Sequence, residues 1–175
     1  QVLNVLSFII ERVGWEIAPF FNSLVNYLPM LWQHSEGHNM LRCAIVSVLT
    51  QIVRVSKQLT DLFKNLLASS APKNLCCKQG LGDQCITLEK FVIPVIEYSL
   101  DMKQEGHVYL QEDGLHLFFA YLENIKRSED IFSDTIIYCI NRETTEHLEV
   151  TLKISTALLF LSPDKFIQVS VHNIN

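Results

Sequence analysis

The sequence predicts an all-α protein made of antiparallel helix pairs. Apolar side chains recur at three- and four-residue steps along most of the chain, which is the period of a helix with one buried face. Glycine and proline are few, with 6 and 5 among 175 residues, and they stand between helical patterns or bend them. The clearest pair, residues 28–53, has a proline in its first helix and a short polar turn. This combination is typical of HEAT repeats, so we expect a HEAT-repeat α-solenoid, in which such pairs stack side by side.

An apolar stripe predicts the first helix. Its members recur at helical spacing and are Val2, Val5, Leu6, Ile9, Ile10 and Val13. Gly14 follows at the place where a left-handed C-terminal cap is expected. Pro19 then stands near the start of the next helix, where its missing backbone donor costs little.

The central helix pair is predicted in most detail. Its first helix carries a buried face of Phe21, Leu24, Leu28, Leu31 and Trp32. Pro29 bends this helix because it removes a backbone donor, and Gly37 lies in the turn at residues 34–38. The second helix covers about residues 38–55, and its buried face is Leu41, Ala44, Ile45, Val48, Leu49 and Ile52. A short amphipathic helix around residues 59–67 and a loop over residues 69–83 come next.

Two more pairs are expected toward the C-terminus. The second pair packs through Leu88, Phe91, Val92, Val95 and Ile96 in its first helix, and through Leu115, Phe118, Phe119, Leu122 and Ile125 in its second. Pro94 bends the first of these helices, the turn lies near Gly106, and close helix packing explains Gly114 inside the second. The third pair starts at the N-cap Ser128 and turns at residues 141–145. Its predicted core is Phe132, Ile136, Ile140, Leu148, Leu152, Leu158, Leu159 and Leu161, and Ser162-Pro163-Asp164 signals a further helix.

Composition limits the classes of function. The net charge of −5 and the pI of about 5.6 give no basic footprint for nucleic acid. Five irregularly spaced cysteines favour a reducing compartment, the cytosol or nucleus. No apolar run approaches the roughly 20 residues that span a bilayer, so no membrane partner is expected. Because the chain starts at Gln1 and its last residues still have a helical pattern, we expect a piece of a longer protein, cut at both ends.

No catalytic, cofactor-binding or metal-binding residue is predicted, so the chain is not expected to be an enzyme. His34 and His38 are four residues apart, but Ser35 stands where a zinc-protease helix needs Glu, and Gly37 puts the pair in a turn. Cys76, Cys77 and Cys85 lack the spacing of a zinc site, and free loop thiols are the better interpretation. Cys43 and Cys139 fall in helical patterns and are expected in the core.

One surface feature is a candidate interaction site. Glu112, His116 and Glu123 advance by four and seven residues, so they share one side of a helix, and Asp113 flanks them. An acidic strip of Glu112, Asp113 and Glu123 on the inner side of a solenoid would attract a basic segment of a protein cargo. The alternative is an ordinary solvated helix face, because helical surfaces are usually charged.

Four stretches of the chain resemble the C-terminal half of a member of the importin-β (karyopherin) family. They are IERVGWEIAPF from residue 10, YLPMLWQHSEGHNMLRCAI from residue 27, FVIPVIEYSLD from residue 91 and HVYLQEDGLHLF from residue 107. The resemblance is specific over residues 2–54 and 80–125 and fades after Lys126. It implies that residues 1–175 form a single helical-repeat segment of about three to four repeats. The family counterparts of Val53 and Gly80 lie close together, so residues 56–80 are interpreted as an insertion or an error in the gene model.

The resemblance also implies a function. Importin-β proteins are nuclear import receptors that bind protein cargo, release it when Ran-GTP binds, and shuttle between cytoplasm and nucleus. Ran-GTP contacts lie in N-terminal repeats that this chain does not contain, so no Ran-binding residue is assigned, and nucleoporins are possible further partners. The competing hypothesis is a generic HEAT-repeat scaffold for protein–protein interaction with no transport role.

Overall fold

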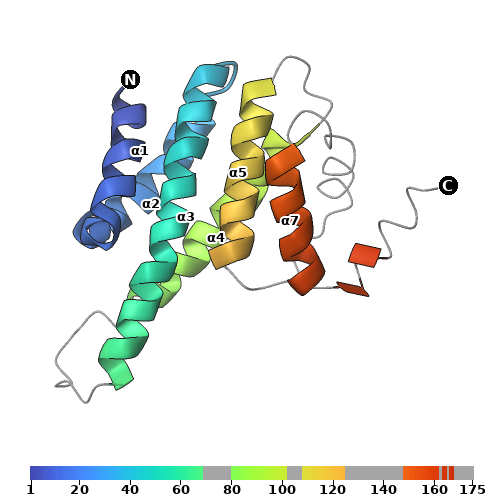
Figure 1. Cartoon of the computed structure of the whole chain (residues 1–175). Helices are drawn as coiled ribbons and strands as arrows, with labels where there is room; N and C mark the ends of the chain where they lie inside the picture. Colours follow the sequence, from blue (N-terminus) through green and yellow to red (C-terminus); the bar gives the residue numbers. More distant parts are fainter. Residues whose placement is uncertain (69–79, 102–107, 125–147, 162, 165, 168–175) are drawn as a thin grey trace. The chain divides into compact units, whose positions relative to one another are not determined.

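The computed structural model describes residues 1–68, 80–101, 108–124, 148–161, 163–164 and 166–167, and these residues contain helices and turns but no strand. In chain order the elements are α1 (Val2–Val13), the 3₁₀ helix η1 (Gly14–Ile17), α2 (Ala18–Gln33), α3 (Asn39–Ala68), α4 (Gly80–Ser99), α5 (Val108–Asn124) and α7 (Leu148–Leu161) (Figure 1). The chain divides into two compact units, residues 1–93 and 94–175, and α4 runs through the boundary. The predicted all-α class is confirmed.

In the first unit, α1 and α2 both pack against α3. The middle of α3 supplies the centre of this core, with six fully buried side chains: Ile45, Val46, Val48, Leu49, Ile52 and Val53. Phe21, Val25 and Leu28 are the buried residues of α2, and Ile10 is the buried apolar residue of α1. The predicted helix pair is therefore confirmed, including Pro29 inside α2. Five residues of its predicted buried faces are only half-buried: Leu24, Leu31, Trp32, Leu41 and Ala44.

A polar cluster fixes the turn between α2 and α3. Ser35 is completely buried and donates a hydrogen bond from Oγ to the Trp32 carbonyl at 2.6 Å. Arg42, also buried, donates from Nε to Ser35 Oγ at 3.3 Å, and its guanidinium lies 4.8 Å from the centre of the Trp32 ring. Gly37 adopts a φ of 75°, a conformation that side-chain-bearing residues rarely take. These contacts tie the end of one helix to the start of the next.

The connection between α1 and α2 depends on Gly14. Its φ of 58° confirms the predicted need for glycine, but its ψ of −127° lies outside the left-handed helical region, so the cap differs from the expected form. The chain continues directly into η1, and Pro19 lies in the first turn of α2, as predicted. A hydrogen bond of 2.9 Å between the hydroxyls of Ser7 and Ser47 joins α1 to α3.

Two sequence expectations for this region were wrong. Val2, Val5 and Ile9 of the predicted buried stripe are exposed, because α1 turns the side with Ser7 and Ile10 toward α3. The second helix does not end near residue 55, since α3 continues to Ala68, and no glycine or proline interrupts it. Residues 80–83 belong to α4 rather than to a loop, whereas residues 69–79 lie outside the described part.

In the second unit, α7 packs against α5. The buried side of α5 includes Leu115, Phe118 and Leu122, as predicted, whereas Phe119 is half-buried. The first helix of the predicted second pair also has the expected buried residues Val95 and Ile96. The expectations for the turn near Gly106, for Ile125, for Ser128, Phe132, Ile136 and Ile140, for Cys139 and for the turn at 141–145 lie outside the described residues.

The buried face of α7 was predicted wrongly for most of its positions. Val150, Thr151, Ile154 and Leu158 are buried, whereas Leu148, Leu152 and Leu159 are exposed. Of the leucines assigned to the core, Leu158 is buried and Leu161 is half-buried. The reason is composition: α7 is apolar on several sides, so its periodicity does not identify which side meets α5.

Candidate acidic interaction surface

Helix α5 places the two predicted glutamates on one side, about three turns apart. Glu112, His116 and Glu123 are exposed on one side of the helix, and Asp113 beside them is half-buried. We call Glu112, Asp113 and Glu123 the acidic strip. Glu112 and Glu123 therefore share one solvent-exposed side of α5, as their spacing predicted.

Close packing on the opposite side holds α5 in place. Gly114 is buried, and a Cβ atom added there would lie 2.5 Å from Ser99 Cβ at the end of α4. Ser99 donates a hydrogen bond from Oγ to the Val95 carbonyl at 2.7 Å, which keeps its side chain along α4. With Leu115 and Phe118 fully buried on the same helix, the strip is carried by a packed element and not by a loop.

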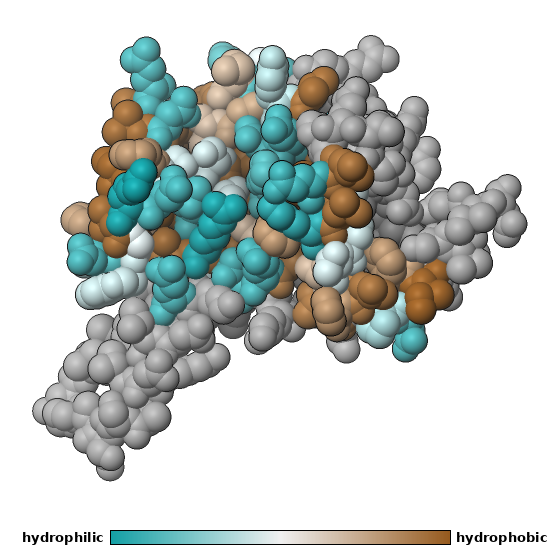
Figure 2. All heavy atoms as spheres, viewed as in Figure 1, coloured by the Kyte–Doolittle hydropathy of each residue, from teal (hydrophilic) through white to brown (hydrophobic). Residues whose placement is uncertain are grey.

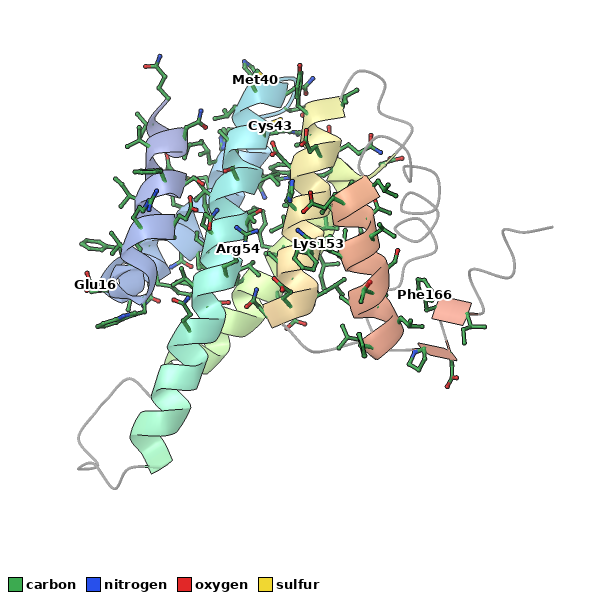
Figure 3. The ribbon with its side chains drawn as sticks, viewed as in Figure 1. Glu16, Met40, Cys43, Arg54, Lys153 and Phe166 are labelled. Atoms are coloured by element: carbon green, nitrogen blue, oxygen red, sulfur yellow. The ribbon has the colours of Figure 1, made fainter. Side chains whose placement is uncertain are left out.

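The neighbouring helix α7 adds charges beside the strip. Lys153 Nζ donates a hydrogen bond to Glu149 Oε1 at 2.6 Å, and Figure 3 labels Lys153 near α5 in this view. This hydrogen bond and the charge of Lys153 hold the pKa of Glu149 below its ordinary value, and the charge of His116 on α5 acts in the same direction. His116, on the same side of α5 as Glu112 and Glu123, therefore lies within electrostatic reach of Glu149 on α7.

The sequence analysis missed one exposed neighbour of the strip. Tyr109 is 74% exposed and precedes Glu112 by three residues and His116 by seven, so it lies on the same side of α5. The spacing of three and seven residues to Glu112 and His116 would have been enough to place Tyr109 on this side of the helix. An aromatic ring next to carboxylates offers a lysine or arginine both a cation–π partner and a countercharge.

The histidines of the α2–α3 turn are bound to the backbone. His34 Nδ1 is 2.7 Å from the Met30 carbonyl oxygen, and His38 Nδ1 is 2.9 Å from the Glu36 carbonyl oxygen. Across the described residues, no group of three or more histidine, cysteine or acidic side chains is placed to hold a metal ion. Cys43 is half-buried, so it is less enclosed than predicted. The described helices also include none with the length and apolarity needed to cross a bilayer.

Comparison with known families gives a match over more than half of the chain. The family model described as "Importin-11-like, TPR repeats" matches residues 77–174. TPR and HEAT repeats are both stacks of antiparallel helix pairs. The match confirms the all-α solenoid class, although the family is described by TPR repeats where the sequence analysis expected HEAT repeats.

Curated relatives extend the similarity to nearly the whole chain. Importin-11 of human and importin-11 of mouse are each 38% identical to this chain over 173 residues, which is 96% of the chain but 15% of those proteins. Importin beta-like protein kap113 of fission yeast is 21% identical over 133 residues, or 76% of this chain and 11% of that protein. No solved structure matches. The chain thus spans about a seventh of the length of human and mouse importin-11.

Proposed function

This chain belongs to the importin-11-like family, and from that membership we propose that it is one segment of a nuclear transport receptor that carries protein cargo. The observation that supports the proposal is the 38% identity to importin-11 over 96% of the chain. The receptor would move between cytoplasm and nucleus. Ran-GTP would bind repeats outside this segment, and nucleoporins are possible further partners. In this proposal the segment catalyses no reaction and needs no cofactor.

We assign the acidic strip of α5 as the part of this segment that faces cargo. Glu112 and Glu123 are exposed and lie on one side of a packed helix, and the exposed Tyr109 lies one turn before Glu112. The complementary ligand is a cargo segment rich in lysine and arginine. Long-range attraction of this kind mainly raises the rate of association and weakens as salt screens it.

The test is cargo-binding kinetics with the full-length receptor. The variant Glu112→Lys/Glu123→Lys reverses two exposed charges, and Asp113 is left in place because it is half-buried. We expect association with a basic cargo to slow by about three- to tenfold at low salt and by less at physiological salt. The matched control, Glu16→Lys/Glu36→Lys, makes the same change in net charge at exposed positions outside α5 and is expected to have little effect.

The outcomes separate three hypotheses. Unchanged kinetics at both salt concentrations would remove the strip as a cargo contact while leaving the receptor function in place. Equal slowing by both variants would mean that net charge, and not this helix side, steers the encounter. A full-length protein that binds neither Ran-GTP nor any nuclear cargo would favour the alternative, a helical-repeat scaffold with no transport role.

A further inference from the structure

The boundary between the two compact units falls inside a helix. One unit ends at Ile93 and the other begins at Pro94, and both residues belong to α4. Boundaries between compact parts of a chain usually fall in exposed linkers, where few contacts cross. Here the connection is α4 itself, so the bending stiffness of this helix limits how far the two units can move against each other.

Pro94 interrupts the hydrogen bonding of α4 at this boundary. Proline has no N–H group, so the carbonyl group of Lys90, four residues earlier, receives no helical hydrogen bond from position 94. Lys90 and Pro94 are both exposed, which allows water to bind the freed carbonyl group. Sharp bends in helices are found mainly at such positions. Pro94 is therefore the place in the interior of α4 where bending costs least.

The two halves of α4 are each fixed by their own core. Before the proline, Leu88 and Val92 are buried in the unit of residues 1–93. After it, Val95 and Ile96 are buried in the unit of residues 94–175, where Ser99 also lies against α5. Because the side chains on both sides of Pro94 are held, any bending of α4 is concentrated at the proline.

Pro29 shows that a proline inside a helix is not sufficient for this role. It lies inside α2 and frees the carbonyl group of Val25 in the same way. Both halves of α2, however, belong to the unit of residues 1–93. Pro29 is half-buried and Val25 is 2% exposed, so this bend is enclosed by one core. The two prolines share their chemistry and differ in their place relative to the units, which makes Pro29 a matched control.

We propose that Pro94 is a hinge, about which the unit of residues 1–93 and the unit of residues 94–175 change their orientation while both cores stay packed. Hinges concentrate a large movement in a few backbone angles and leave the packed parts on either side unchanged. Such a hinge allows this segment to fit partners of different shape. The inference rests on α4 alone and is independent of the proposed transport function.

Distance distributions from pulsed electron paramagnetic resonance test the proposal in the full-length protein. Spin-labelled non-canonical amino acids replace Met40 in one unit and Leu152 of α7 in the other, which leaves the native cysteines unlabelled. These side chains are 78% and 57% exposed, and Figure 2 shows hydrophobic side chains at the surface over α7. A second labelled pair, Met40 and Val5, lies within one unit and reports the width that the labels themselves contribute. We expect the distribution between the units to be about twofold broader than the one within a unit.

Two proline variants connect this width to Pro94. Pro94→Ala restores a donor for the Lys90 carbonyl group and should narrow the distribution between the units toward the width found within one unit. Pro29→Ala restores a donor in α2 and should leave the width unchanged. Melting curves show whether each variant is folded.

Three results would overturn the hinge. Equal widths for the two labelled pairs in the unaltered protein would do so, and this comparison requires no variant to fold. A folded Pro94→Ala protein with an unchanged width would place the movement elsewhere in the chain. Equal narrowing by Pro94→Ala and Pro29→Ala would mean that helix stiffness in general, and not the position of Pro94, determines the width.

Discussion

Gly114 lies at a close contact between α4 and α5. A methyl group there would meet Ser99 Cβ at 2.5 Å, and Ser99 Cβ is fixed to the backbone of α4. Gly114→Ala gains about 1 kcal/mol of helix propensity but forces the helices apart, which costs about 1–3 kcal/mol. We expect net destabilisation of about 1 kcal/mol in denaturant unfolding.

The double variant with Ser99→Gly makes this prediction specific. Once the obstructing Cβ atom is removed, Gly114→Ala should stabilise the chain relative to Ser99→Gly alone, by up to about 1 kcal/mol. The same destabilisation in both backgrounds would mean that Gly114 is required for a reason other than its contact with Ser99.

The Glu149–Lys153 pair predicts that the stability of the fold depends on the protonation of one carboxyl group, that of Glu149. Lys153 lowers the pKa of Glu149 in the folded chain, so the pair stabilises the fold above the unfolded-state pKa, and this contribution is lost as pH falls through the folded-state pKa. Both side chains are exposed, so the energetic contribution is small. In an NMR titration, Lys153→Gln should raise the pKa of Glu149 toward its ordinary value.

The control for that titration is an exposed lysine on another helix. Lys90→Gln removes the same charge from α4 and should leave the pKa of Glu149 unchanged. His116→Asn should raise it less than Lys153→Gln does, since His116 contributes only through its charge. A larger response to His116→Asn would contradict the assignment of Lys153 as the dominant partner.

At the scale of whole helices, adjacent leucines of α7 test which side is packed. Leu158 is 1% exposed and Leu159 is 44% exposed. Leu158→Ala should therefore destabilise the chain by about 2–5 kcal/mol, because it empties a packed site. Leu159→Ala makes the same chemical change next to it and should cost less than about 1 kcal/mol. Similar losses in denaturant melts would place both leucines in one core.

The existence of the helices could be predicted from the sequence better than their orientation. The residues of α3 were predicted well because polar residues interrupt its apolar positions at a clear period, and Ile45, Val48, Leu49 and Ile52 are all buried. The sides of α1 and α7 were predicted poorly because each helix is apolar on more than one side. A periodic pattern tells where apolar side chains gather, but not which neighbouring helix is present to cover them.

The exposure of the acidic residues was predictable to a similar extent, whereas their role stays a prediction. Helical spacing placed Glu112 and Glu123 on one exposed side of α5, as found. The half-burial of Asp113 was not predicted, and the electrostatic interaction between His116 and Glu149 arises from packing between α5 and α7, whose residues are far apart in sequence. No spacing rule contains that information.

At the scale of the molecule, the division into two compact units predicts uneven responses to core mutations. Leu49 is fully buried in the unit of residues 1–93, and Phe118 is fully buried in the unit of residues 94–175. Helical repeats open in segments, since each repeat contacts only its neighbours. Leu49→Ala should speed amide hydrogen exchange in α1, α2 and α3 more than in α5 and α7.

Phe118→Ala is the matched variant in the other unit and should give the reverse pattern. Hydrogen exchange followed by mass spectrometry resolves the two, with α4 expected to respond to both because it crosses the boundary. Equal acceleration everywhere by both variants would indicate that the chain opens only as a whole.

The polar cluster at the α2–α3 turn has a consequence for the order of events during synthesis. Trp32, Ser35 and Arg42 are neighbours along the chain as well as in space, so their contacts need no residue made later than Arg42. Translation adds about 5–20 residues per second, and a local turn of this kind closes far faster than the next residue is added. The corner between the two helices can therefore be set as this stretch leaves the ribosome, before α5 and α7 have been made.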